Sequence, residues 1–186
     1  HGVYVQEQID ISIVKVLVGL RQEWFTEILN KGTDKETQTE TKAFIPRVGL
    51  VVEASENINL YSTWVKGFQP QGANIQSDPE RYGGPFDYVK SELHEIGLKT
   101  EWFNKRLNAT ISVFKINQEN SLEQSAKTGK PDWRVPVDEE SNGFEVDVAG
   151  RIAPNWSVVA NYAYTDARIV KLKEEGALKD LNMQRP

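Results

Sequence analysis

Apolar and polar residues alternate with a period of two along most of this chain, whereas the apolar spacing of a helix is rare. Residues 143–152 show the alternation most clearly, because Phe144, Val146 and Val148 alternate with Glu145 and Asp147. This pattern is typical of a β-strand with one apolar and one polar face. It predicts eight strands, at residues 2–9, 14–25, 43–54, 58–68, 91–102, 106–117, 143–152 and 156–168.

The segments between these strands are alternately short and long. The Ala153-Pro154-Asn155 segment predicts a tight turn, since proline fixes φ at a turn position. The pattern as a whole predicts four antiparallel hairpins with short turns at one end and long loops at the other, as in a transmembrane β-barrel. The turns are expected near residues 10–13, 55–57, 103–105 and 153–155, and the polar loops at residues 26–42, 69–90, 118–137 and 170–186.

Alternation alone does not distinguish a membrane barrel from a soluble β-sandwich, because both have one apolar face on each strand. Strand length favours the barrel: about ten to twelve residues suit a tilted strand that crosses lipid, whereas soluble strands average about five or six. Aromatic residues near the strand ends are also typical of the girdles at the two membrane interfaces. These residues are Trp24, Phe25, Trp64, Phe68, Trp102, Phe103, Trp156, Tyr162 and Tyr164.

The composition of the 186 residues excludes several kinds of chemistry. The net charge is -5 and the basic residues are scattered, so a nucleic-acid partner is not expected. The absence of cysteine excludes disulfides and thiolate metal sites, and the two histidines, His1 and His94, are poor material for a catalytic or zinc site. No apolar run approaches the roughly 18 residues of a membrane helix. We therefore expect no enzyme activity, no bound metal and no cofactor.

Six segments, in order and with matching spacing, resemble the barrel of TonB-dependent ferric-siderophore receptors of the ferrichrome and ferric-pyoverdine type. The resemblance covers nearly the whole chain. The segments are GVYVQEQI (2–9), VLVGLRQEWF (16–25), FIPRVGLV (44–51), NLYSTWVKGFQPQ (59–71), ELHEIGLKTEWFNKRLNATISVFKI (92–116) and NGFEVDVAGRIAPNWSVVANYAYTDARI (142–169).

The resemblance implies an all-β fold, an antiparallel up-and-down transmembrane barrel of about 22 strands, of which residues 1–186 would supply about eight. It implies that the plug domain and the remaining strands lie outside this segment. It further implies TonB-dependent uptake of a ferric siderophore across the outer membrane of a Gram-negative cell. Its partners would be the siderophore, the TonB complex through the plug, and outer-membrane lipid, with iron carried only inside its chelate.

The long loops would then face the ligand outside the cell, and their aromatic residues are candidates for stacking on it. Ordinary packing within the loops is the competing interpretation. Two other functions stay open from the residues alone: a complete small eight-stranded structural or adhesion barrel, and a soluble β-sandwich or lipocalin-like binding module. The candidate ligand-binding residues are Trp64, Phe68, Tyr82, Phe86, Tyr88 and Trp133.

Overall fold

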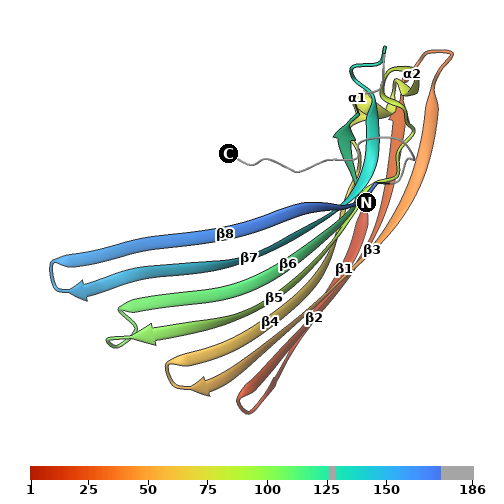
Figure 1. Cartoon of the computed structure of the whole chain (residues 1–186). Coiled ribbons are helices and arrows are strands. Elements are labelled where there is room, and N and C mark those ends of the chain that lie inside the picture. The colour runs from red at the N-terminus through yellow and green to blue at the C-terminus, as the bar shows by residue number, and fades with distance from the viewer. Residues whose placement is uncertain (126–128, 173–186) are drawn as a thin grey trace.

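A computed structural model describes residues 1–125 and 129–172, which form one curved sheet of eight antiparallel strands (Figure 1). The strands follow one another in space in the order of the sequence, so each pair of neighbours is a hairpin. Their bounds are β1 (Gly2–Ile11), β2 (Val14–Leu29), β3 (Thr37–Ser55), β4 (Ile58–Gln69), β5 (Val89–Trp102), β6 (Leu107–Gln124), β7 (Arg134–Ala153) and β8 (Trp156–Leu172).

The tight turns lie together at one end of the sheet, which we call the turn side, and the opposite end is the loop side (Figure 1). The turns occupy residues 12–13, 56–57, 103–106 and 154–155 of the described chain, as the sequence predicted. Ser12 and Asn104 have φ angles of 54° and 56°, the left-handed conformation that tight hairpin turns commonly require. The hydrophobic pattern and the turn residues therefore agree on the topology.

The strands extend further toward the loop side than the alternation predicted. The β2–β3 pairing continues to Leu29 with Thr37, and the β6–β7 pairing to Gln124 with Arg134. The extents predicted for the loops at 26–42 and 118–137 are thus wrong, since the connections shrink to 30–36 and 125–133. The added strand residues are mostly polar on both faces, so hydrophobic alternation does not detect them, although backbone pairing holds them. The loop expected at 170–186 lies mostly outside the described residues.

The β4–β5 connection carries two short helices on the loop side, α1 (Ala73–Gln76) and α2 (Pro79–Tyr82) (Figure 1). Asp78 caps α2, because its Oδ1 accepts a hydrogen bond from the Arg81 backbone N–H at 3.2 Å. Among the described residues, no helix has the length and apolar character that crossing a membrane would require.

One face of the sheet, which we call the apolar face, carries the exposed aliphatic and aromatic side chains. Ile96 on β5 pairs with Val113 on β6, and Val113 pairs with Phe144 on β7. These three side chains are 62%, 55% and 39% exposed, and a continuous apolar surface of this kind is expected only where lipid or another protein covers it. Other large residues of this face are Val3, Val5, Val18, Leu20, Val48, Leu50, Leu60, Ile111, Tyr162 and Tyr164.

The buried apolar core of the described residues is small and consists of Ala43, Val135, Val137 and Ala167. A β-sandwich would need a second sheet to cover the apolar face, yet the described strands form a single sheet. A closed eight-stranded barrel would need β1 to pair with β8, and within the described residues these strands are the two edges. The structure therefore supports part of a larger barrel and neither of the alternatives.

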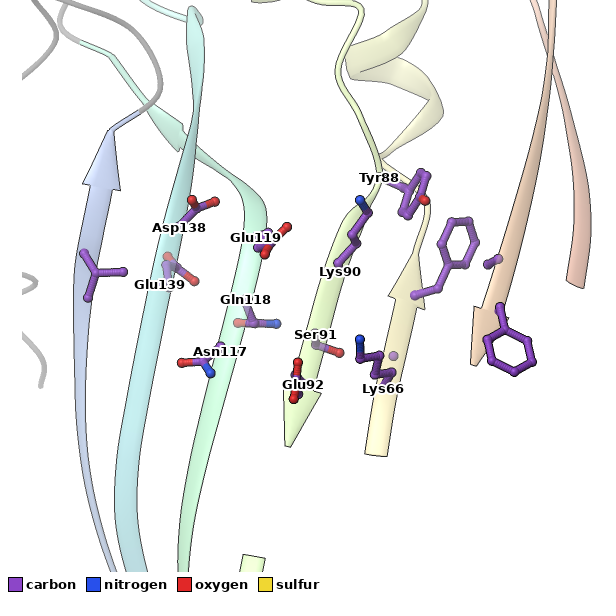
Figure 2. A pocket seen from close by; sticks show the side chains of 15 residues that line it. Lys66, Tyr88, Lys90, Ser91, Glu92, Asn117, Gln118, Glu119, Asp138 and Glu139 are labelled. Atoms are coloured by element: carbon purple, nitrogen blue, oxygen red, sulfur yellow. The ribbon is translucent and has the colours of Figure 1, made fainter. Parts of the chain in front are cut away.

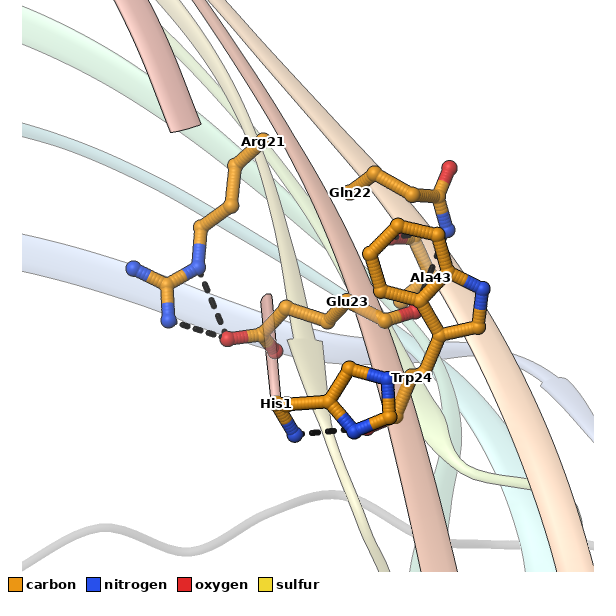
Figure 3. Close-up of polar contacts among 6 residues, drawn as sticks. All are labelled: His1, Arg21, Gln22, Glu23, Trp24 and Ala43. Carbon is orange, nitrogen blue, oxygen red and sulfur yellow. Dashed lines mark hydrogen bonds and ion pairs between the residues drawn. The ribbon is translucent and has the colours of Figure 1, made fainter. Parts of the chain in front are cut away.

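Gln22 and Trp24 lie on the loop-side half of β2, and Figure 3 shows Trp24 beside His1 and Gln22 beside Ala43. The His1 ring stacks on the Trp24 indole with centroids 5.4 Å apart, and the Trp24 backbone N–H donates to the His1 carbonyl at 2.9 Å. Gln22, two residues nearer the turn side, donates from Nε2 to the Ala43 carbonyl at 3.1 Å. Trp24 thus has the position of an interfacial aromatic residue, whereas the adjacent Phe25 projects from the opposite face of the strand.

On the opposite face, which we call the polar face, large side chains lie across glycines of the neighbouring strand. Tyr61 covers Gly97, and Phe114 covers Gly143. A Cβ at Gly143 would lie 2.5 Å from the Phe114 ring and closer still to the Tyr164 carbonyl oxygen. Glycine at these positions lets an aromatic ring lie flat against the sheet.

Gly143→Ala should therefore lower the free energy of unfolding by about 1–3 kcal/mol, because the new methyl group meets backbone as well as the ring. Gly49→Ala is the matched control, since a Cβ there would have its nearest neighbour, Leu17 Cβ, at an ordinary 3.6 Å. Urea unfolding in detergent, followed by tryptophan fluorescence, measures both. Equal stabilities of the two variants would contradict the close approach at Gly143.

Candidate ligand-binding site

A cleft opens on the loop side because β3 separates from β4 while it stays paired with β2. The β3–β4 pairing ends at Arg47 with Val65, whereas the β2–β3 pairing continues to Leu29 with Thr37. Pro46 is the first residue of β3 beyond the last β3–β4 pair, and proline has no N–H to donate to a ladder. The proline that is unusual for a central strand thus lies where β3 becomes unpaired on one side.

This cleft contains a cavity of about 850 Å³, within the usual range of small-molecule sites. The β2–β3 hairpin forms one wall and the β4–β5 connection forms the other. Among the described lining residues Lys35 is the one basic side chain. The others include the rings of Phe25, Phe68, Phe86 and Tyr88, the hydroxyls of Thr37, Thr39 and Thr41, and the carboxylates of Glu27, Asp34, Glu36, Asp78, Glu80 and Asp87.

Gln76, the last residue of α1, holds the segment that carries Phe86. Its Nε2 donates to the Phe86 carbonyl at 2.7 Å, and its Oε1 accepts from the Phe86 backbone N–H at 2.8 Å. One side-chain amide thus satisfies both backbone groups of Phe86, as a strand partner would. The position of the Phe86 ring in the cavity wall depends on this pair of hydrogen bonds.

Two asparagines connect the β4–β5 connection to its neighbours. Asn30, in the β2–β3 turn, donates from Nδ2 to the Ser77 carbonyl at 3.2 Å. Asn120 lies at the register shift between β6 and β7, and its Nδ2 donates to the Tyr88 carbonyl at 3.1 Å. Gln71 donates to the Asn120 carbonyl at 2.7 Å. These contacts fix the connection from both sides, so the cavity has a defined shape.

A second cavity of about 460 Å³ lies beside the first and is lined by residues from β3 to β8 (Figure 2). Phe68 and Tyr88 line both cavities, and their ring centroids are 4.5 Å apart in a tilted arrangement. The Lys90 ammonium lies 5.2 Å from the centroid of the Tyr88 ring. The aromatic pair is therefore the wall that the two cavities share.

The remaining candidates from the sequence lie outside both linings. Trp64 is on the apolar face of β4 and donates from Nε1 to Glu92 Oε1 at 2.7 Å. Tyr82 lies beneath the Arg81 guanidinium, 5.2 Å from its carbon to the ring centroid. Trp133 contacts Gly83, where a Cβ would lie 2.7 Å from the indole. Of the six candidates, Phe68, Phe86 and Tyr88 thus line the larger cavity, and ligand binding by any of the six stays a prediction.

Tyr82 and Trp133 lie where the β4–β5 connection meets the β6–β7 hairpin. Arg81 donates from Nε to Asp132 Oδ2 at 2.8 Å, and Lys130 Nζ donates to the Glu80 carbonyl at 3.0 Å. The hydrogen bond and the charge of Asp132 raise the pKa of the Arg81 guanidinium. Packing between loops is thus the observed role of this region.

Phe25, the threonines and the carboxylates of the larger cavity were missed by the sequence interpretation. Phe25, Glu27, Asp34, Glu36 and the threonines lie in or beside the polar segment at 26–42, and Asp78, Glu80 and Asp87 lie in the segment at 69–90. Both segments were predicted to be loops. A signal was present, because Thr37, Thr39 and Thr41 alternate with Gln38 and Glu40, and threonine is favoured in strands. An alternation between two kinds of polar residue is invisible to a search for apolar faces.

No catalytic or metal-binding arrangement is found in the part of the chain that the structure describes. His94 Nε2 lies 2.9 Å from Glu92 Oε1, which also accepts from Trp64, so this imidazole belongs to a structural contact on β4 and β5. No group of three or more His, Asp or Glu side chains among the described residues is placed to hold a metal ion.

The chain matches one family model, TonB dependent receptor-like, beta-barrel, over residues 1–184. The chain belongs to this family. It is thus a segment of an outer-membrane receptor barrel.

Similar proteins include a ferric-pyoverdine receptor of a Pseudomonas species, 25% identical over 92% of this chain and 21% of that protein. The metal-pseudopaline receptor of Pseudomonas aeruginosa is 27% identical over 90% of the chain and 24% of that protein. The solved pyoverdine outer-membrane receptor of Pseudomonas aeruginosa, bound to pyoverdine, superposes with a TM-score of 0.76 at 24% identity and covers 92% of this chain. The chain thus spans about a quarter of the length of these relatives.

Gln76→Ala should expose the Phe86 backbone amide, because it removes the acceptor of that N–H. We expect hydrogen exchange at the Phe86 amide to become roughly threefold to tenfold faster, which corresponds to the loss of one typical hydrogen bond. Asn74→Ala, in the same helix, is the control, since among the residues that the structure describes the Asn74 side chain makes no hydrogen bond, and its backbone carbonyl, which the substitution keeps, accepts from the Ser77 hydroxyl. Unchanged exchange at Phe86 in the Gln76 variant would contradict this role.

Proposed function

We propose that this chain forms part of the barrel of an outer-membrane receptor for the TonB-dependent uptake of ferric siderophores. The observation that carries the proposal is the cavity of about 850 Å³ on the loop side of a sheet of this receptor family. Its aromatic rings offer flat apolar surface, and its hydroxyl and carboxylate groups offer polar contacts to a chelate. The similarity to a ferric-pyoverdine receptor supports the choice of cargo.

The orientation in the membrane follows from the two ends of the sheet. Barrels of this kind have short periplasmic turns and longer extracellular loops. The turn side of this sheet then faces the periplasm, and the loop side, with both cavities, faces the outside of the cell. The apolar face is covered by outer-membrane lipid, and the polar face is directed into the barrel.

We further propose that residues 1–186 belong to a single barrel domain that the rest of a longer receptor completes. The two open edges, β1 and β8 of the described sheet, have backbone groups available for neighbouring strands of the same barrel. A plug domain would fill the lumen and connect the receptor to the TonB complex, which supplies the energy for uptake. Iron would stay in its chelate throughout, so the barrel would need no metal ligands of its own.

Phe68, Phe86 and Tyr88 are the proposed stacking residues, and Tyr82 and Trp133 are proposed to support the loops around the site. Trp64, on the apolar face of β4, is proposed to lie at the membrane interface. The Phe68–Tyr88 ring pair is suited to the first role because it forms a wall of the cavity. Aromatic residues supply large contact areas at low conformational cost and are frequent among residues that dominate binding.

Phe68→Ala together with Tyr88→Ala should weaken ferric-siderophore binding by the full receptor about tenfold, equivalent to about 1.4 kcal/mol. Phe103→Ala, at a turn-side residue that is 57% exposed, is the control and should leave binding unchanged. Titration of the purified receptor with ferric chelates, followed by tryptophan quenching, measures the affinity.

Two results would argue against the proposal. Absence of binding for every ferric chelate tested would remove the assignment of cargo. Equal affinities of the double variant and the parent receptor would leave the cargo but place its site away from this cavity.

A further inference from the structure

We infer that the larger cavity makes the receptor select ferric chelates that carry positively charged groups over neutral and anionic ones. This inference rests on the proposed function and names the class of siderophore that the site would take. It comes from the charges on the two walls of the cavity, which were not among the candidate residues from the sequence.

Carboxylates from two separate segments line this cavity. Glu27, Asp34 and Glu36 come from the β2–β3 hairpin. Asp78, Glu80 and Asp87 come from the β4–β5 connection on the other side of the cleft. The one basic residue of the described lining, Lys35, leaves a clear excess of negative charge around a space of about 850 Å³.

Among the described residues, most of the negative charge of these walls is left without an ion-pair partner, although the Arg81 guanidinium interacts electrostatically with Asp78. Within residues 1–125 and 129–172, the ion pairs of loop-side carboxylates include Asp132 with Arg81 and Glu140 with Lys115, and none involves a carboxylate of the larger cavity. Two of the cavity carboxylates accept backbone N–H groups instead: Glu36 from Gly32 at 2.7 Å and Asp78 from Arg81 at 3.2 Å. These backbone donors bring no positive charge to the cavity.

The carboxylates are spread over the two walls of the cavity. This arrangement indicates a shared negative electrostatic potential rather than a set of ligands for one metal ion. A calcium or magnesium ion needs several oxygen ligands converging on one point, and no such group of acidic side chains is found among the described residues. A cleft lined by charges of one sign instead raises the local concentration of oppositely charged ligands and their rate of association.

The aromatic rings of the same cavity act in the same direction. Phe25, Phe68, Phe86 and Tyr88 line it, and an aromatic ring attracts an ammonium or guanidinium group placed over its face. A chelate with such groups would therefore gain from both the rings and the carboxylates. A ferric tricatecholate, which is a trianion, would gain from the rings alone and be repelled by the carboxylates.

The test uses two chelates that differ in charge at one terminal group. One is a ferric trihydroxamate with a terminal protonated amine, and the other is the same chelate with that amine acetylated. At about 10 mM salt, where the Debye length is about 30 Å, the full receptor should bind the charged chelate about fivefold to tenfold more tightly. At about 1 M salt, where the Debye length is about 3 Å, the two affinities should converge.

Glu27→Gln combined with Asp87→Asn should bring the low-salt ratio of affinities to about twofold or less, because one carboxylate is removed from each wall. The affinity for the charged chelate should fall by a larger factor than the affinity for the acetylated chelate. Glu56→Gln, in the turn between β3 and β4 on the turn side, is the matched control and should keep the full ratio.

The outcomes separate this inference from the proposed function. If the receptor binds both chelates equally at low salt, or prefers a ferric tricatecholate, the charge selectivity is wrong while siderophore binding stands. If the receptor binds none of the three chelates, the proposed function itself fails. A ratio that survives in the double variant would place the selectivity outside this cavity and overturn the inference.

Discussion

The register of the antiparallel ladder is the constraint on which the rest of this structure depends. Successive side chains of a strand point to opposite faces, so a slip of one residue in one pairing would move a whole apolar set to the wrong face. The shifts found in the described strands occur near Glu53, Asn120, Asp138 and Arg151. They lie toward the two ends of the sheet. Between them the pairing is continuous, and this continuity keeps a lipid-compatible face separate from a polar one.

The unequal extension of the same ladder creates the candidate site. β2 and β3 remain paired beyond the point where β3 leaves β4, and the separation is filled by the connection that contains α1 and α2. Side-chain amides then replace the missing ladder: Gln76 binds both backbone groups of Phe86, and Asn30 and Asn120 connect this segment to the neighbouring hairpins. The rigid strands position the walls, and a few hydrogen bonds position the residues that line them.

The charges of the loop side serve two different purposes. Arg81 and Asp132 pair across two loops and hold them together. None of the carboxylates of the larger cavity forms an ion pair within the described residues, so most of their negative charge acts on a ligand that enters the space. Aspartates occur both in the ion pair between the loops and in the cavity walls, so their position, rather than their residue type, decides which purpose they serve. Stability between loops and selectivity for a ligand can therefore be altered separately.

The sequence by itself determined the topology and the family of this protein. Alternation at residues such as Phe144, Val146 and Val148 identifies strands, and turn residues such as Pro154 divide them into hairpins, because both signals are local. The sequence also indicated Phe68, Phe86 and Tyr88 as aromatic residues near a long connection. It did not separate them from Tyr82 and Trp133, since all five lie in similar polar surroundings along the chain.

Only the tertiary structure decided where the strands end, where the cavity lies and which charges face it. The polar extensions of β2 and β3 have no apolar face to reveal them, and they exist because backbone hydrogen bonds to a neighbouring strand hold them in place. Glu27 and Asp87 are 60 positions apart in the chain, and they line one cavity because two hairpins diverge and a loop folds back between them. Contacts of this kind depend on long-range pairing, which a local pattern of residues does not encode.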